Sequence, residues 1–481
     1  MYSEIGMRKL GLKGNAMTKL VFSIMLIIST CSLYGASDSH MLFIQNEKIK
    51  VGIDLSIGGA ITHVSRINGP NMINSCDWGR QIQQSYYSGP PNYTKLGKEK
   101  SPGWAGFCWN PIQSGDSYNN GSKVLKHSIT EDSIYVKTQP MLWPMRDDPG
   151  ECYFETWITL KDSAFTWRAK IVNSRSDKTF YGGYPQELPA VYTNGPWHKL
   201  MSYTGSKPFE GGKLTEIRND HSEAWPWCNF LATERWAALV DEHNEGLGVI
   251  CPTVSSFAGG FAGKARGKGG PKDFPTGYMS PMNQEILDHN IVYEYSRDFY
   301  VGSLQEIRDY ASKQRTSNPP AWKFNRSRAS WTYVNAIDGG WPVKGGVNIK
   351  ATSTPARLVS PFAYWNADNA HYIAVRATVG REGTTGDARV YWRGTPDEGS
   401  FTGTEWGEWS SRWWAVERSL VLPLINDGKP HWFSAKLAGN ALYTGGITGL
   451  AIDLPAMAPD SGIRIHEIRL LKDEKALSRL K

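Results

Sequence analysis

Alternation of hydrophobic and polar residues dominates the chain from residue 41 onward. In the segment 49–53, Ile49, Val51 and Ile53 are separated by a lysine and a glycine. A period of two predicts a half-buried strand, and the Gly58-Gly59 turn predicts a return strand at 60–67. The same pattern predicts strand pairs at 124–138, 153–172 and 236–251, a further pair formed by 291–295 and 298–301, and a short helix at 303–313.

The composition of the chain changes after this first set of strands. Residues 315–320 are polar and end in two prolines, which is typical of a linker. Beyond them strands continue, and 463–470 alternates strictly, as a closing strand should. We therefore expect one domain at 37–314, a linker at 315–324 and a second domain at 325–475. Tryptophan gathers in the second domain, at Trp392, Trp406, Trp409, Trp413 and Trp414.

Composition supports an all-β globular protein. The 481 residues are 40% hydrophobic and 21% charged, and they include 49 glycines and 27 prolines. That balance favours strands and turns over helices. The net charge of +7 comes from scattered residues without a Lys/Arg run, so nucleic acid is not expected as a partner.

The first 36 residues resemble an export signal. Lys19 precedes the apolar run 20–28, and small and polar residues follow up to Ala36. This run is too short to span a bilayer and suits the hydrophobic region of a signal peptide. We expect cleavage near Ala36 and a secreted or periplasmic protein. Lipid anchoring through Cys31 is the less favoured alternative, because Thr30 stands where a lipoprotein box prefers glycine or alanine. No later segment is apolar enough to span a membrane.

Five further cysteines are far apart and include no C-x-x-C pair, which argues against a zinc site. Export permits disulfides, yet an odd count leaves at least one thiol unpaired, and buried free thiols are the favoured interpretation. We expect no metal and no cofactor, apart from a structural calcium held by loop acids such as Asp453. The oligomeric state is left open.

Two stretches resemble known folds. Residues 50–74, with the Gly58-Gly59 turn, and the later segments 277–281 and 293–304 resemble the galactose-mutarotase-like β-supersandwich, over residues 40–312. The segments 427–433, 447–453 and 463–470 resemble the jelly-roll sandwiches appended to many bacterial glycan-degrading enzymes. The resemblance implies an N-terminal β-supersandwich, a C-terminal carbohydrate-binding-like β-sandwich and a carbohydrate partner. The mutarotase glutamate near the closing strands has no counterpart in Met279-Ser280-Pro281, which argues against aldose epimerase activity.

Four polar and aromatic clusters could carry chemistry. In 77–87, taken as one strand, Arg80, Gln84 and Tyr86 share a face and could bind sugar hydroxyls or a carboxylate. In 104–116, Trp109 could stack on a sugar ring and Asn110 could bind its hydroxyls, with Asp116 beside them. The remaining candidates lie in 186–199 and 221–227, and they are Glu187, Tyr192, Trp197, His198, Glu223 and Trp225.

Roles follow from side-chain chemistry. Glycoside hydrolysis needs two carboxyl groups, and Asp116, Glu187 and Glu223 are the candidates. A lyase for uronic-acid polymers instead needs charge neutralisation and a base, which Arg80 with His198 or Tyr192 could supply. Ordinary structural roles compete with each assignment, since buried tryptophan and exposed histidine are common. We expect a secreted polysaccharide- or oligosaccharide-cleaving enzyme, with a hydrolase favoured over a lyase. The alternatives are a non-catalytic glycan-binding envelope protein and, less favoured, a sugar epimerase.

Overall fold

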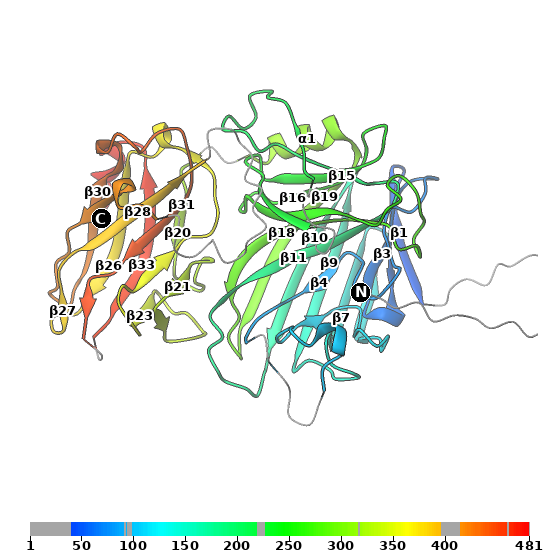
Figure 1. Ribbon diagram of the computed structural model, residues 1–481, viewed down its shortest axis with the longest axis horizontal. Helices are drawn as coiled ribbons and strands as arrows, with labels where there is room; N and C mark the ends of the chain where they lie inside the picture. Colours follow the sequence, from blue (N-terminus) through cyan, green and yellow to red (C-terminus); the bar gives the residue numbers. More distant parts are fainter. Residues whose placement is uncertain are drawn as a thin grey trace, which may run out of the picture. The chain divides into compact units, whose positions relative to one another are not determined.

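The computed structural model describes residues 40–90, 93, 99–218, 227–315, 318–395, 414–458 and 461–480. The predicted signal segment and Cys31 lie outside these residues. The described chain is almost entirely β, with short helices only, which confirms the predicted all-β class (Figure 1).

The strands up to residue 303 form three antiparallel sheets. One is a three-stranded sheet of β1 (Met41–Gln45), β2 (Ile49–Asp54) and β3 (Ala60–Arg66). The nine-stranded sheet runs in the order β13 (Thr215–Glu216), β12 (Lys199–Ser202), β15 (Trp236–Val240), β16 (Glu245–Ile250), β19 (Val292–Ser303), β10 (Ala164–Asn173), β9 (Cys152–Lys161), β7 (Ser133–Gln139), β6 (Lys123–Ile129). The seven-stranded sheet runs β14 (Trp227–Leu231), β17 (Ser256–Ala262), β18 (Thr276–Ile286), β11 (Gly183–Asn194), β4 (Gln83–Ser85), β5 (Pro111–Ile112), β8 (Met141–Leu142).

The strands after residue 320 form a second sandwich. Its first sheet runs β22 (Ala336–Asp338), β23 (Val347–Ala351), β33 (Ile463–Leu471), β26 (Tyr372–Val379), β30 (Pro430–Lys436), and β20 (Ala321–Lys323) also pairs with β33. Its second sheet runs β21 (Thr332–Val334), β24 (Arg357–Val359), β31 (Gly446–Asp453), β28 (Ala388–Gly394), β29 (Ser419–Leu422), and β25 (Trp365–Asn366) also pairs with β31. A small ribbon joins β27 (Thr384–Thr385) to β32 (Ala456–Met457), and a short helix α2 (Glu474–Leu477) follows β33.

Most predicted hairpins are present. The pairs β2–β3, β6–β7, β9–β10 and β15–β16 match the alternating segments, and β33 matches the predicted closing strand. The predicted helix is α1 (Leu304–Lys313), which begins at a capping box. There the Ser303 hydroxyl accepts from the Glu306 backbone, and the Glu306 side chain accepts from the Ser303 backbone. Such reciprocal bonds satisfy two backbone donors that the helix leaves free.

One prediction of local structure was wrong. The expected strand pair at 291–301 is the single strand β19, because Arg297 continues the inward-facing series and donates its Nε to the Leu188 carbonyl at 3.0 Å. The glycine-rich segment 259–263 lies mostly in β17. A Cβ at Gly259 would come within 2.6 Å of both Leu200 and the Tyr278 carbonyl oxygen, so glycine is required by close packing. Strand β20 lies inside the range 315–324 that was expected as a linker.

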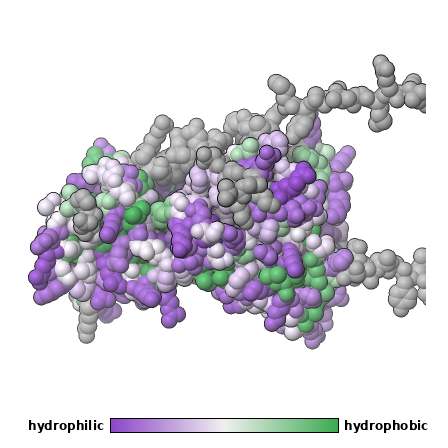
Figure 2. Space-filling model, turned by 90° about the horizontal axis from the view of Figure 1, so that it is seen from below, coloured by the Kyte–Doolittle hydropathy of each residue, from purple (hydrophilic) through white to green (hydrophobic). Residues whose placement is uncertain are grey.

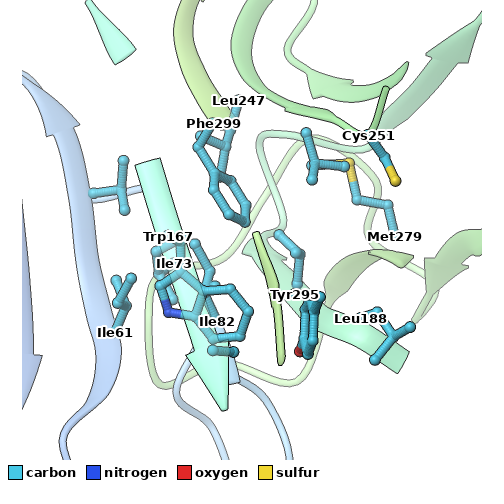
Figure 3. Packing of buried hydrophobic residues seen from close by; sticks show 14 of the residues in the cluster. Ile61, Ile73, Ile82, Trp167, Leu188, Leu247, Cys251, Met279, Tyr295 and Phe299 are labelled. Atoms are coloured by element: carbon cyan, nitrogen blue, oxygen red, sulfur yellow. The ribbon is translucent and has the colours of Figure 1, made fainter. Parts of the chain in front are cut away.

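Hydrophobic side chains from the two large sheets interlock to form the first core. Trp167 and Phe299 come from the nine-stranded sheet, and Leu188 and Met279 come from the seven-stranded sheet (Figure 3). All four are 0% exposed. The five cysteines of the described chain are free thiols, and Cys76 is the exposed one among them. No helix in the described ranges is long and apolar enough to cross a membrane.

Buried charges connect the two sandwiches. Arg328, 5% exposed, donates to Asp288 of the first sandwich at 2.6 Å and to Asp338 of the second at 2.6 and 2.8 Å. Nearby, Ser330 of the second sandwich donates to Glu285 on β18 at 2.5 Å. Burial raises the pKa of Glu285 from 4.5 to about 7, although hydrogen bonds from Ser330, Tyr293 and Asn283 partly oppose it.

The raised pKa of Glu285 predicts a pH-dependent stability. A carboxyl group that binds its proton more tightly in the folded state stabilises the fold most below the unfolded pKa, and this stability is lost as the pH rises from 4.5 to about 7. We expect Glu285→Gln to be more stable than the wild type above pH 7, by up to about 3 kcal/mol, with the difference vanishing in acid. Urea unfolding followed by tryptophan fluorescence would measure this. An equal difference at both pH values would contradict it.

Candidate carbohydrate site

Three aromatic side chains cluster on the outer face of the seven-stranded sheet, the face turned away from the first core. Tyr192 of β11 and Trp227 of β14 each lie beside Tyr278 of β18, with ring centroids 4.8 Å apart in both pairs. Tyr278 follows the alternation of β18, because its neighbour Met279 points into the core. The small Ala258 on β17 completes this outer-face cluster.

Glu187 lies at the edge of this cluster. It precedes a β-bulge in β11, where the register with β18 shifts between Glu187 and Val191. Bulges redirect side chains and often occur beside functional sites. The Tyr278 hydroxyl donates to Glu187 Oε1 at 2.5 Å. Burial raises the pKa of Glu187, and hydrogen bonds from Ser85 and Tyr278 only partly oppose it. The carboxyl group is thus biased toward its protonated form.

A guanidinium–carboxylate pair lies near the same cluster. Arg80 Nε lies 3.0 Å from Asp77 Oδ2, and Arg80 Nη1 donates to the Phe274 carbonyl at 2.6 Å. The guanidinium also stacks over the Phe274 ring, 4.6 Å from its centroid, and that ring is 61% exposed. Burial raises the pKa of Tyr192 well above its ordinary value. Glu187 and Asp77 raise it further, and Arg80 opposes them.

The structure thus gathers three of the sequence-predicted residues, Arg80, Glu187 and Tyr192, in one region. Gln84 and Tyr86 do not join them. Gln84 donates to Thr156 Oγ1 of the opposite sheet at 2.8 Å, and Tyr86 donates to Gln84 Oε1 at 3.0 Å inside the core. The expected continuous strand 77–87 is restricted to β4, because residues 77–80 form a turn, so Arg80 does not share a strand face with them.

The tryptophans expected to stack on sugar are core residues. Trp109 is 2% exposed and Trp197 is 7% exposed, and both belong to the first hydrophobic core. Asn110 is buried and donates to the Tyr86 carbonyl at 2.5 Å. A large ring that is buried between two sheets removes more apolar surface from water than a ring on the surface does. This accounts for the core positions of both tryptophans.

Asp116 and His198 also have structural surroundings. Asp116 is 0% exposed and accepts from the backbone of Tyr118, Asn120 and Asp147, so it closes a turn and lies away from solvent. His198 is held between the Pro196 carbonyl at 3.0 Å and Glu242 at 3.1 Å. No described contact joins either residue to Glu187. The predicted Glu223 and Trp225 lie outside the described residues.

Sequence reasoning missed four residues of this site, namely Ser85, Asp77, Trp227 and Tyr278. Tyr278 lies in the segment 277–281 that suggested the fold, and the alternation along that segment already separates it from Met279. Ser85 pairs with Glu187 across two strands that are about a hundred residues apart in sequence, so local patterns give no signal for it.

Metal ligands do not identify the site. Within the described residues, no group of three or more His, Cys, Asp or Glu side chains could hold a metal ion. Asp453, the calcium candidate, accepts from Arg357 through both oxygens, at 2.5 and 2.9 Å. On the face drawn in Figure 2, hydrophobic residues form separate groups among hydrophilic ones.

No protein-family model matches the sequence, and no curated protein matches it. Among solved structures, a putative aldose 1-epimerase from Escherichia coli is similar at 12% identity, over 55% of this chain and 100% of its own, with a TM-score of 0.37. A galactose mutarotase-like protein from Lactobacillus casei is similar at 12% identity, over 54% of this chain and 99% of its own, with a TM-score of 0.35. A 4-alpha-glucanotransferase from Thermococcus litoralis is similar at 12% identity, over 55% of this chain and 38% of its own, with a TM-score of 0.33. Galactose-mutarotase-like domains are thus structural neighbours of about 55% of this chain.

Proposed function

We propose that this protein is a secreted carbohydrate-active enzyme that hydrolyses a glycosidic bond at the outer face of the seven-stranded sheet. The observation that carries the proposal is the Glu187 carboxyl, whose pKa is raised by burial and which lies against Tyr278 beside two further aromatic rings. Aromatic faces stack on sugar rings, and a carboxyl group that keeps its proton can act as a general acid.

In this mechanism Glu187 gives its proton to the glycosidic oxygen as the bond to the anomeric carbon breaks. A water molecule attacks that carbon, and its proton passes to a second carboxylate. Asp77 is the candidate for this base. Its charge raises the pKa of Tyr192, as the charge of Glu187 does, so both carboxyl groups lie in the region of that tyrosine. The Tyr278 hydroxyl, which donates to Glu187, holds the carboxyl in place and stabilises its charge after proton transfer.

Two observations favour hydrolysis over a lyase reaction. A lyase needs a cation to neutralise the uronate carboxylate, but Arg80 is already paired with Asp77. It also needs a base, and the pKa of Tyr192 is raised well above its ordinary value, so that phenol holds its proton at neutral pH. The export-like segment at 20–28 supports action outside the cytoplasm.

The test is incubation of the purified protein with a panel of neutral and acidic polysaccharides. New reducing ends and the ultraviolet absorbance of unsaturated uronates would be followed together. We expect reducing ends without absorbance. A rise in both would overturn the hydrolase in favour of a lyase. Binding of a glycan that stays uncut would favour a non-catalytic binding protein, and mutarotation of free sugars would indicate an epimerase.

A further inference from the structure

A second place suited to a ligand lies between the two sandwiches. It is a cleft of about 850 Å³, bounded by the ends of β18 and β19 on one side and by β20, residues 327–330 and Trp341 on the other. That volume is within the range of small-molecule sites. The rings of Tyr293, Trp322 and Trp341 line it, as do several polar side chains.

Glu285 gives this cleft a hydrogen-bonding group without a full set of partners. The side chain is 6% exposed and lines the cleft. Asn283, Tyr293 and Ser330 donate to it at 2.7, 3.0 and 2.5 Å, and all three bonds end on Oε1. Oε2 accepts none of the hydrogen bonds that the described residues make. A carboxylate oxygen with spare lone pairs inside a cleft can accept from a ligand hydroxyl.

The charges around Glu285 indicate which ligand would fit. Arg328 is already neutralised by Asp288 and Asp338, so it offers little to an anionic ligand. Glu294, which also lines the cleft, is an acid paired with Arg168 at 3.5 Å. An ionised Glu285 would repel a carboxylate, whereas hydroxyl groups could donate to it. Arg235 and Arg297 also line the cleft, and both donate to backbone carbonyl groups. Aromatic walls with a carboxylate oxygen open to the cleft therefore favour a neutral polyhydroxylated molecule over an acidic one.

We propose that this cleft is a second carbohydrate site, which binds a short neutral saccharide through Oε2 of Glu285 and the aromatic rings around it. The choice of a saccharide rests on the proposed function, whereas the location of the site rests on the cleft itself. Glu187 is not among the residues that line this cleft, so loss of binding here and loss of the outer-face chemistry can be distinguished.

The pH dependence of binding distinguishes this site. Glu285 is faced by Asn283 of its own strand, Tyr293 of β19, and Ser330 and Arg328 of the second sandwich. Burial raises the pKa of Tyr293 well above its usual value, and the pKa of Arg328 is raised by its two carboxylates against the effect of burial, so neither changes charge near neutral pH. Glu285, with a pKa of about 7, is the group that titrates there. A hydroxyl donating to the ionised form makes a charge-assisted bond, so affinity should rise about tenfold as the pH rises through 7.

The experiment is calorimetric titration with lactose, maltose and cellobiose, and with galacturonic acid as an acidic probe. It uses Glu187→Gln protein, to prevent turnover, at pH values below and above about 7. For at least one disaccharide we expect a binding event that strengthens with pH in this background and becomes independent of pH when Glu285→Gln is added. Trp341→Ala should weaken it at least about tenfold, and Trp432→Ala, a half-buried tryptophan on β30, should not.

Hydrogen exchange of the saturated complex would locate the ligand. Protection of residues 283–293 and 327–330 is the expected result. Protection confined to β11 and β14, or binding that Glu285→Gln and Trp341→Ala leave unchanged, would overturn the second site while leaving the proposed function standing. If galacturonic acid binds and none of the disaccharides does, the proposal that the ligand is neutral would be overturned. If no saccharide binds anywhere and the polysaccharide panel is also uncut, both proposals fail.

Discussion

Glu187→Gln is expected to lower kcat by about 10²–10⁴-fold on the glycan that the wild type cleaves, with little change in KM. Glutamine keeps the size of the side chain and can still accept from Tyr278, so the outer face should fold unchanged. What it cannot do is give a proton to the glycosidic oxygen. The expected loss is therefore confined to the step in which the bond breaks, and initial rates across a substrate series would measure it.

The pH profile makes this prediction specific to a general acid. Because the folded pKa of Glu187 is raised, the group stays protonated to a higher pH than an ordinary glutamate, and wild-type activity should fall as the pH rises through that pKa. The residual activity of the variant should lack this alkaline decline. Glu131→Gln, an exposed acid in the β6–β7 turn, is the matched control and should retain wild-type rates. Wild-type kcat in Glu187→Gln would exclude Glu187 as the acid.

The alternating pattern predicted the fold well where each strand has one buried face. Hairpins such as β9–β10 alternate along ten residues per strand, and their register follows from a short turn. The pattern failed where burial includes a charge or where both faces are packed. Arg297 resembles a turn residue in sequence, yet its guanidinium is buried against carbonyl groups in β19. β17 resembles a loop because its glycines are needed for close packing.

The sequence predicted only those residues of the candidate site that lie close together along the chain. Glu187 and Tyr192 lie on one strand, and all four residues between them are apolar, a local pattern that is typical of a desolvated acid. The contribution of Tyr278 and Ser85 depends on which strands neighbour β11, which no local pattern specifies. For Trp109 and Trp197 the local pattern was ambiguous. A tryptophan beside an amide or histidine suits a sugar site and a hydrophobic core equally well, and here both side chains are in the core.

Arg328→Ala is expected to destabilise the protein by about 3–5 kcal/mol, the cost of removing one partner from a buried ion pair. The side chains of Asp338 and Asp288, which Arg328 neutralises, are 2% and 8% exposed. Burial alone would raise the pKa of Asp338, but hydrogen bonds and charge from Arg328 outweigh it and keep that pKa below its ordinary value. Without the guanidinium both carboxylates would be buried and uncompensated. We expect a melting temperature lower by roughly 3–5 °C in scanning calorimetry, because a chain of this length has a large entropy of unfolding.

The pH dependence of this loss separates an unpaired charge from simple loss of packing. Without Arg328, the folded pKa of Asp338 should rise above its unfolded value, because burial then acts on it unopposed by the guanidinium. The destabilisation should then shrink as the pH falls toward about 4, where the buried Asp338 carboxyl takes up a proton. Arg326→Ala, two residues away and exposed, removes a similar side chain without a buried partner and should change little. Adding Asp288→Asn and Asp338→Asn to Arg328→Met should recover part of the lost stability, because most of the cost comes from the charges left behind. A loss that is equal at all pH values, or that matches Arg326→Ala, would mean that the buried charges do not hold the two sandwiches together.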